Sequence, residues 1–443
     1  MRPMYDAGTM MDKATTEKLR LPELLAIGVG GMIGGGIFSV LGIAVGISGH
    51  AAPLAFLLGG LIALSAGYSY VKLALTFRSD GASFTYLERA FPNQLHVAGL
   101  MGWTVIVGYV GTLALYAFTF GAYGADLLGS PGDNTVRMTL SIGVLVFFMI
   151  VNLRGVRTSG VTEDMIVFTK VLLLGLFAAA GLRTISRDHL LPVFDHGTGS
   201  VFVAGATIFV AFEGFQLITN AVCETDKPKQ NIPRGIYGSI IITTIIYLGV
   251  AIVAIGNLTA SEIADAEEYV LAVAAKPSLG EAGQVLVGIA ALLATSSAIN
   301  ATSFGSSRMM AEMATEKMMP RAFSFRDRRA NVPWVAVMTM TAFGVVFTAF
   351  NSLDTIAAFS SLTFLIVSIG VSVANLRLRA RTHSKAWLVV LGMTLMSATV
   401  VMLVIHLWDQ KRTTLMWVLG IYAAVFITEY LFSQRRLVFK ERQ

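Results

Sequence analysis

The sequence predicts an all-α integral membrane protein with twelve transmembrane helices, and three observations support this class. Hydrophobic residues make up 55% of the 443 residues and charged residues only 14%, whereas a soluble domain carries about 25% charged residues. Apolar stretches of about 20 residues, the length that crosses a bilayer as a helix, recur along the whole chain. Basic residues gather in alternate connections between these stretches, as is typical of cytoplasmic loops.

The twelve apolar segments follow one another with short connections. They lie at about residues 22–47, 53–77, 97–128, 136–153, 161–183, 200–223, 235–257, 282–314, 333–350, 354–376, 386–407 and 414–433. Lysine and arginine are frequent in both terminal tails and after segments 8 and 10, and sparse in the alternate connections. The positive-inside rule therefore places both termini in the cytoplasm, which agrees with an even number of helices. We expect a multi-pass protein of a cell membrane, plasma or inner.

Segment 1 contains a dense cluster of glycines, six of them within residues 28–36. Each glycine weakens a helix interior by up to about 1 kcal/mol relative to alanine, so the cluster predicts an unwound stretch near the middle of the membrane. Such backbone is tolerated at that depth only where it is buried in protein or lines a cavity. An outer half-helix beginning near residues 34–36 would offer free N–H groups to a carboxylate. The alternative is that the glycines serve close helix packing.

Segment 6 is interrupted in the same way, because Gly214 follows the acidic Glu213 in the middle of an apolar run. Segments 1 and 6 are five apart and so enter the membrane with opposite orientation. Two interrupted helices in corresponding positions of two halves indicate the binding site of a secondary transporter. We expect inverted five-helix repeats over about 21–184 and 200–380 that form a core over 21–380, preceded by a tail over 1–20 and followed by helices 11 and 12 over 381–434 and a tail over 435–443.

Lys170 stands in segment 5 among residues that are almost all apolar. A charge at bilayer depth costs roughly 2.5–3.5 kcal/mol on insertion scales, so such a residue usually has a partner, a water-filled cavity or a function. Burial disfavours the charged form of an amine and nearby carbonyl oxygens favour it. A lysine between these two influences can take up and release a proton. The alternatives are a lysine that stays charged as a fixed cation, and one that snorkels to the interface.

Glu213 and the neighbouring aromatic residues allow several interpretations. The carboxyl of Glu213 could pair with a substrate ammonium, take up a proton during transport, or hydrogen-bond unwound backbone while protonated. Phe209, Phe212 and Phe215 recur at helical spacing, which is typical of core packing, although the break makes Phe212 a candidate lid over a substrate.

Segment 8 carries three polar residues of interest, Ser296, Ser297 and Asn300. Ser297 and Asn300 are three residues apart and share a helix face. They could serve the Lys170 site or join helices by hydrogen bonds.

At this point the chain resembles the amino acid–polyamine–organocation superfamily of transporters, which has the LeuT-like fold. The resemblance is carried by Gly-Met-Ile-Gly-Gly-Gly-Ile-Phe at 31–38, by Phe-Glu-Gly-Phe at 212–215 and by Lys-Pro-Lys-Gln-Asn-Ile-Pro-Arg at 227–234, which is similar to the cytoplasmic loop after segment 6. Strings at 170–177, 254–258, 271–277 and 296–302 are similar to a prokaryotic, proton-coupled branch of that superfamily. The resemblance to the superfamily spans about residues 20–380.

The resemblance implies transport of amino acids by alternating access, with helices 1 and 6 unwound at mid-membrane around the substrate. It implies that the substrate carboxylate binds the N–H groups of Ile33, Gly34, Gly35 and Gly36. The substrate ammonium would meet carbonyls of Gly30 or Gly31 and of segment 6, from about Phe209 to Phe212. Lys170 would stand where sodium-coupled relatives hold a sodium ion, between the carbonyl of Gly30 and the hydroxyl of Ser296 or Ser297.

We therefore predict a transporter that imports neutral amino acids of several kinds together with protons, with Lys170 and Glu213 as coupling residues. Its partners would be the amino acid, protons and the lipid bilayer, with no nucleic acid, sodium, metal or cofactor, and no sequence feature assigns an oligomeric state. An alternative, which Glu213 favours, is a carrier or exchanger for cationic amino acids or polyamines. Another is a sensor that binds without translocating. No nucleotide-binding loop or Ser/His/Asp set indicates an enzyme.

Overall fold

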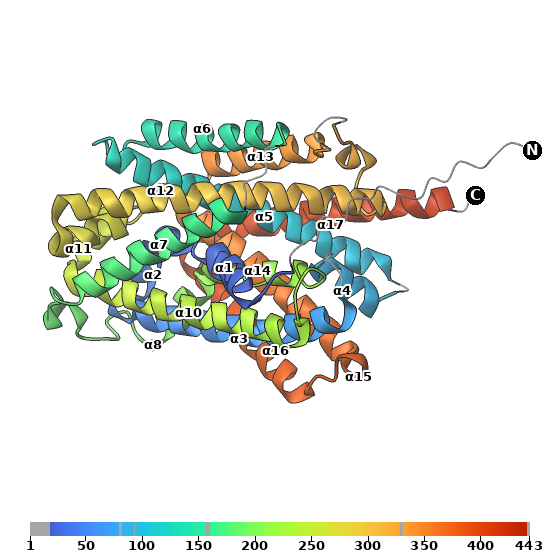
Figure 1. Cartoon of the computed structure of the whole chain (residues 1–443), viewed down its shortest axis with the longest axis horizontal. Coiled ribbons are helices and arrows are strands. Elements are labelled where there is room, and N and C mark those ends of the chain that lie inside the picture. Colours follow the sequence, from blue (N-terminus) through green and yellow to red (C-terminus); the bar gives the residue numbers. More distant parts are fainter. Residues whose placement is uncertain (1–17, 79–81, 93, 156–159, 328–330, 441–443) are drawn as a thin grey trace, which may run out of the picture.

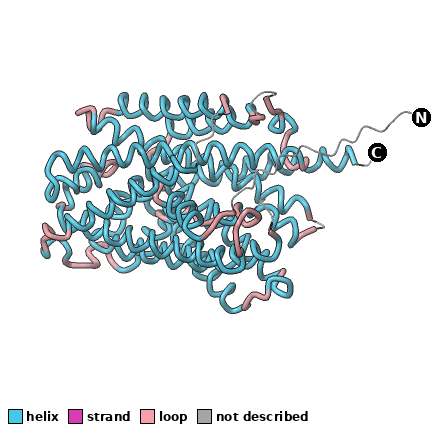
Figure 2. Tube along the Cα trace, viewed as in Figure 1, coloured by secondary structure: helices cyan, strands magenta, loops and turns pink. Residues whose placement is uncertain are grey.

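The computed structural model describes residues 18–78, 82–92, 94–155, 160–327 and 331–440. Within these ranges the regular elements are helices, and the one β-type contact is a bridge between Leu19 and Thr225. Most of the helices run in a common direction as one bundle (Figure 1), and loops are short and lie mainly at its two ends (Figure 2). An apolar composition with helical periodicity leaves a chain few other folds, because a helix satisfies its own backbone in lipid.

The elements follow one another along the chain, η denoting a 3-10 helix. They are α1 (Leu21–Met32), α2 (Gly36–Ser48), η1 (Gly49–Ala51), α3 (Ala52–Phe77), α4 (Ala82–Ala90), α5 (Leu95–Leu127), α6 (Asn134–Leu153), α7 (Gly160–Gly181), η2 (Arg187–Leu190), α8 (Thr198–Thr207), η3 (Phe209–Phe212), α9 (Leu217–Asn220), α10 (Pro228–Asn257), α11 (Ala260–Asp265), α12 (Val270–Thr315), η4 (Arg321–Ser324), α13 (Trp334–Phe350), α14 (Leu353–Arg377), α15 (Arg379–Thr382), α16 (Ala386–Gln410) and α17 (Arg412–Lys440).

Eight helical stretches of the described residues are long and apolar enough to cross a membrane. The number becomes nine when the bent pair of Thr198–Thr207 and Phe209–Asn220 is taken as one span, and three shorter apolar helices accompany them. The chain is thus an all-helical, multi-pass membrane protein, while the number of twelve stays a prediction. Fewer candidate spans are found than the twelve predicted, partly because the break after Met32 leaves α1 with only 12 residues.

Two helices are interrupted inside the bundle. Residues 33–35 separate α1 from α2. The second interruption separates α8, η3 and α9, and the chain bends there by 53°. The depth of both interruptions in the bilayer stays a prediction.

The ends of the chain differ in how far the structure describes them. Residues 1–17 of the expected N-terminal tail, and the last residues 441–443 of the expected C-terminal tail, lie outside the described residues. The segment before α1 pairs with the connection after α9, since the N–H of Leu19 donates to the carbonyl of Glu224 and the N–H of Asp226 donates to the carbonyl of Leu19. At the other end α17 continues to Lys440, past the predicted end of helix 12 at residue 434.

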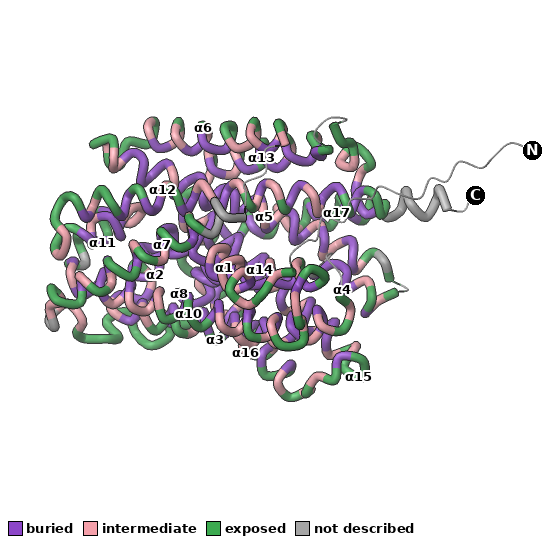
Figure 3. Tube along the Cα trace, in the orientation of Figure 1, coloured by how far each residue is buried: buried purple, intermediate pink, exposed green. Residues whose placement is uncertain are grey.

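The core lies where helices of the two expected halves meet. The buried positions gather along the centre of the bundle, around α1 and α14, and the exposed ones on the outer turns (Figure 3). The helix α5 packs against α12 and α14, and α10 packs against α1 and α3. In contrast α6, α16 and α17 expose large apolar side chains such as Phe147, Leu391 and Phe426. An exposed apolar face of this kind is expected for helices that face lipid.

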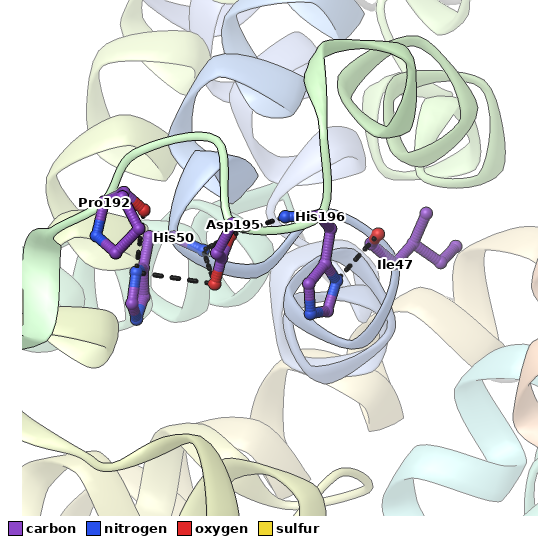
Figure 4. Close-up of polar contacts among 5 residues, drawn as sticks. All are labelled: Ile47, His50, Pro192, Asp195 and His196. Atoms are coloured by element: carbon purple, nitrogen blue, oxygen red, sulfur yellow. Dashed lines mark hydrogen bonds and ion pairs between the residues drawn. The ribbon is translucent and has the colours of Figure 1, made fainter.

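At one end of the bundle the connection between α7 and α8 is fastened to the end of α2 (Figure 4). The carboxylate of Asp195 accepts hydrogen bonds from the backbone N–H groups of His50 and His196, both at 3.1 Å. The Nδ1 atom of His50 lies 3.1 Å from the carbonyl oxygen of Pro192. The Nδ1 atom of His196 lies 3.2 Å from the carbonyl oxygen of Ile47. These contacts fix the start of α8 relative to α2.

Candidate functional site

A cavity of about 720 Å³ lies between α1, α5, α12 and the connection from η3 to α9. At one end it is lined by Gly30, Gly31, Glu213 and Gly214, which belong to the two interruptions. At the other end it is lined by Glu23 and other residues near the start of α1 and the end of α12. The cavity therefore connects the two broken helices with one end of the bundle.

The two interruptions touch each other at Gly31 and Gly214. A Cβ atom on Gly214 would lie 2.6 Å from the carbonyl carbon of Gly31 and 2.7 Å from the nitrogen of Met32. The φ angle of Gly214 is +142°, a region that favours glycine. Glycine is thus required here both by the backbone conformation and by the close approach of the two chain segments.

Lys170 is 2% exposed. Its Nζ atom donates a hydrogen bond of 2.8 Å to the carbonyl oxygen of Gly30. Val167, one turn earlier on α7, packs against Gly30, where a Cβ atom would lie 2.6 Å from its Cγ2. The structure thus brings the lysine of α7 to the last turn of α1.

The polar residues of α12 are placed in two different ways. Ser297 lines the cavity, and Ser296 and Ser297 are both half-buried on a helix that packs extensively against α7. The side chain of Asn300 accepts a hydrogen bond of 3.1 Å from the Nδ2 of Asn152, which joins α12 to α6. Asn300 therefore makes a contact of the kind that commonly joins helices in membranes.

Glu213 follows η3 directly and is 6% exposed. It lines the cavity, and its Oε1 atom is buried without a hydrogen-bond partner among the described residues. Tyr109, Thr112 and Tyr116 belong to the same cavity wall. A buried carboxyl without a partner is unfavourable in its charged form. A bound proton or a nearby cation would stabilise Glu213 at this position.

The remaining predicted substrate residues lie behind the cavity wall. Ile33, Gly34, Gly35 and Gly36 are buried and do not belong to the lining, whereas Gly30 and Gly31 do. The ring of Tyr116 covers Gly35, and Ala298 faces Gly34.

Phe209 and Phe212 are fully buried. The ring of Phe212 packs edge-on against that of Tyr247 with centroids 5.3 Å apart. In this conformation the cavity therefore reaches the end of α1 but not the start of α2.

Two hydroxyl groups that the sequence did not single out satisfy backbone at the interruptions. The hydroxyl of Tyr247 lies 2.7 Å from the carbonyl oxygen of Met32 and 3.0 Å from that of Ala211. The hydroxyl of Ser361 donates to the carbonyl of Thr207 and accepts a hydrogen bond from the N–H of Val210, 2.9 Å away. Their only sequence signal is a polar group within an apolar segment, which many transmembrane helices share.

Known proteins resemble the chain over most of its length. The sequence model of the family described as "Amino acid permease" matches residues 19–428. An uncharacterized protein of Methanocaldococcus jannaschii is 32% identical over 94% of this chain and 96% of its own length. The inner membrane transport protein YbaT of Escherichia coli is 29% identical over 95% of this chain and 97% of its own. The branched-chain amino acid permease BcaP of Bacillus subtilis is 25% identical over 85% and 83%, respectively.

Proposed function

This chain belongs to the amino acid permease family, and on that premise we propose that it imports neutral amino acids together with protons by alternating access. Transport of amino acids, rather than catalysis, follows from the family and from relatives that are named as transporters. Beyond the family, we propose protons as the coupling ion, neutral amino acids as the substrates and import as the direction of transport. We also propose that residues 21–380 form a transporter core of two inverted repeats.

The observation that carries the proposal is the hydrogen bond from the ammonium of Lys170 to the carbonyl of Gly30. The C-terminal end of α1 carries a partial negative charge, which favours a cation at that place. An ammonium that occupies it makes a metal cation unnecessary, so no sodium is required. Loss of the proton removes the charge and the attraction between α7 and α1. The protonation of Lys170 would therefore bias the equilibrium between two conformations, with Ser296 and Ser297 as further partners of the amine.

The cavity supports a release step toward the cytoplasm. It extends to the end of the bundle where α1 begins, which the positive-inside rule places on the cytoplasmic side. Binding of the substrate carboxylate at the N–H groups of Ile33, Gly34, Gly35 and Gly36 would require the ring of Tyr116 to move away from Gly35. We propose that this movement accompanies the return to the substrate-bound state.

The lining of the cavity supports neutral substrates of several kinds. Small and apolar residues such as Val105, Leu217, Ala298 and Ala301 form much of its wall. Such a wall excludes few side chains by charge. The name of one relative, a branched-chain amino acid permease, agrees with apolar substrates. A carrier or exchanger of cationic amino acids is the second candidate, and the buried carboxyl of Glu213 favours it.

Uptake of labelled alanine into proteoliposomes tests the proposal. With the purified protein, an acidic exterior should drive accumulation of alanine above its external concentration, and a protonophore should abolish it. Replacing sodium by choline should leave the accumulation of alanine unchanged. Uptake that requires a sodium gradient, or that occurs only in exchange for an internal amino acid, would contradict proton symport. Stronger competition by arginine than by leucine would favour the second candidate.

A further inference from the structure

The carboxyl of Glu213 stands at the place where the two broken helices touch. Gly214, the next residue, has its backbone packed against Gly31 and Met32 of the first interruption. The carboxyl is 6% exposed and lines the same end of the cavity as Gly31. A ligand that entered the cavity as far as the interruptions would therefore meet this carboxyl.

The described residues leave one oxygen of this carboxyl without a hydrogen-bond partner. Its Oε1 atom is buried without a hydrogen bond, and the ion pairs found in the described part of the chain do not include it. Tyr109 and Tyr116 line the same cavity, and neither carries a positive charge. The Oε1 atom therefore makes no hydrogen bond to the unwound backbone of the described residues. A proton or a cationic ligand remains to satisfy the oxygen.

The neighbouring end of α1 adds negative potential at the same place. Three of its last four carbonyl groups are occupied, because Val29 accepts from the N–H of Ile33, Gly30 from Lys170 and Met32 from Tyr247. The remaining one, that of Gly31, belongs to a residue that lines the cavity. The last carbonyls of a helix carry its partial negative charge. A cation beside Gly31 would thus be attracted by both the helix end and the carboxyl.

We propose that Glu213, together with the carbonyl of Gly31, binds the α-ammonium of the amino acid substrate. This inference rests on the proposed function, and it names the residue that recognises the group that amino acids have in common. An ammonium offers three N–H donors and a full positive charge. It can therefore satisfy the carboxylate and the carbonyl at the same time, through charge-assisted hydrogen bonds. A proton alone would satisfy only the carboxyl.

The first test is the variant Glu213→Gln, which keeps the shape of the side chain and removes its charge. The KM for alanine uptake in proteoliposomes should rise at least about tenfold, because a hydrogen bond to a charged group is lost in a buried site. The matched control is Glu281→Gln, the same change in an exposed carboxylate of α12 that does not line the cavity. Its KM should stay within about a factor of two of the wild type, because exposed charges contribute little.

The second test uses the wild-type protein, so it does not depend on a variant that folds. Propionate is alanine without its ammonium, and it should compete poorly with labelled alanine. In Glu213→Gln the difference between the two competitors should shrink. Equal competition by propionate on the wild type would overturn the proposal.

Other outcomes on the variant would also overturn it and would indicate another role. An unchanged KM with loss of the response to the pH gradient would make Glu213 a proton carrier. A loss confined to arginine and lysine would make it a side-chain subsite. Failure of the wild type to accumulate any amino acid would instead contradict the proposed function, and binding of alanine to the purified wild type would separate the two failures.

Discussion

The hydroxyl of Tyr247 lies 2.7 Å from the carbonyl oxygen of Met32, the last residue of α1. The same hydroxyl lies 3.0 Å from the carbonyl oxygen of Ala211 in the second interruption. A hydroxyl has a single proton and donates to one acceptor at a time. The two interruptions therefore share one donor on α10, and a movement of either broken helix changes the hydrogen bond that is left for the other.

The variant Tyr247→Phe should lower both stability and transport. It leaves two buried carbonyl groups without their shared donor, and an unsatisfied buried group costs about 1–3 kcal/mol. We expect a lower midpoint of thermal unfolding in detergent and slower alanine uptake. Tyr237→Phe, on the same helix but half-buried, is the matched control and should unfold close to the wild type. Equal midpoints for the two variants would contradict the role of the shared hydroxyl.

The variant Ser361→Ala should destabilise the second interruption. Its hydroxyl donates to the carbonyl of Thr207 and accepts from the N–H of Val210, two backbone groups that the bent helix leaves without helical partners. We expect a loss of about 1–3 kcal/mol, measured as a shift in the unfolding midpoint. Ser360→Ala is an adjacent and equally buried control, because that hydroxyl bonds only to the carbonyl of Ile356 in its own helix. If both variants lose the same stability, the contact with the interruption contributes nothing specific.

The interruptions themselves could be predicted from the sequence, because glycines clustered in an apolar segment remove helical stability locally. The residues that stabilise these interruptions could not be predicted from the sequence. Tyr247 and Ser361 come from α10 and α14, remote in sequence, and one hydroxyl in an apolar helix does not reveal its acceptor. The ring of Tyr116 over Gly35 belongs to one conformation of the protein, which a sequence does not specify.

Helix boundaries were less predictable than helix breaks. The helix α12 runs from Val270 through a kink at Gly280, so the segment predicted to begin at about residue 282 has an additional helical part before it. Lys276, Pro277 and Ser278 interrupt the apolar run at this point, although the helix continues through them as far as the kink.

The variant Gly214→Ala should prevent the two interruptions from meeting. Its Cβ atom would come within 2.7 Å of backbone atoms of Gly31 and Met32, which no side-chain rotation can relieve, at a φ angle that disfavours alanine. We expect little folded protein on size-exclusion chromatography and no alanine uptake. Gly305→Ala is the control on the wall of the same cavity, because a Cβ atom there meets nothing within 4 Å. Normal folding of Gly214→Ala would show that the contact is not required.

Variants of Lys170 should separate a proton switch from a fixed cation. Lys170→Ala removes the donor to Gly30 and should reduce pH-driven accumulation of alanine to simple equilibration, while the protein still folds. Lys170→Arg keeps a positive charge that is not released at working pH. If Lys170 switches, the arginine variant should bind and exchange alanine but no longer respond to a pH gradient.

The measurement is accumulation in proteoliposomes at several external pH values, together with counterflow exchange, which needs no proton movement. The control is Lys276→Ala, a change in an exposed lysine that pairs with Glu281 outside the site, and its pH profile should match the wild type. A pH response retained by Lys170→Arg would support the fixed cation. An unchanged profile in Lys170→Ala would remove the lysine from the coupling altogether, and the proton would then have to act elsewhere along the cavity.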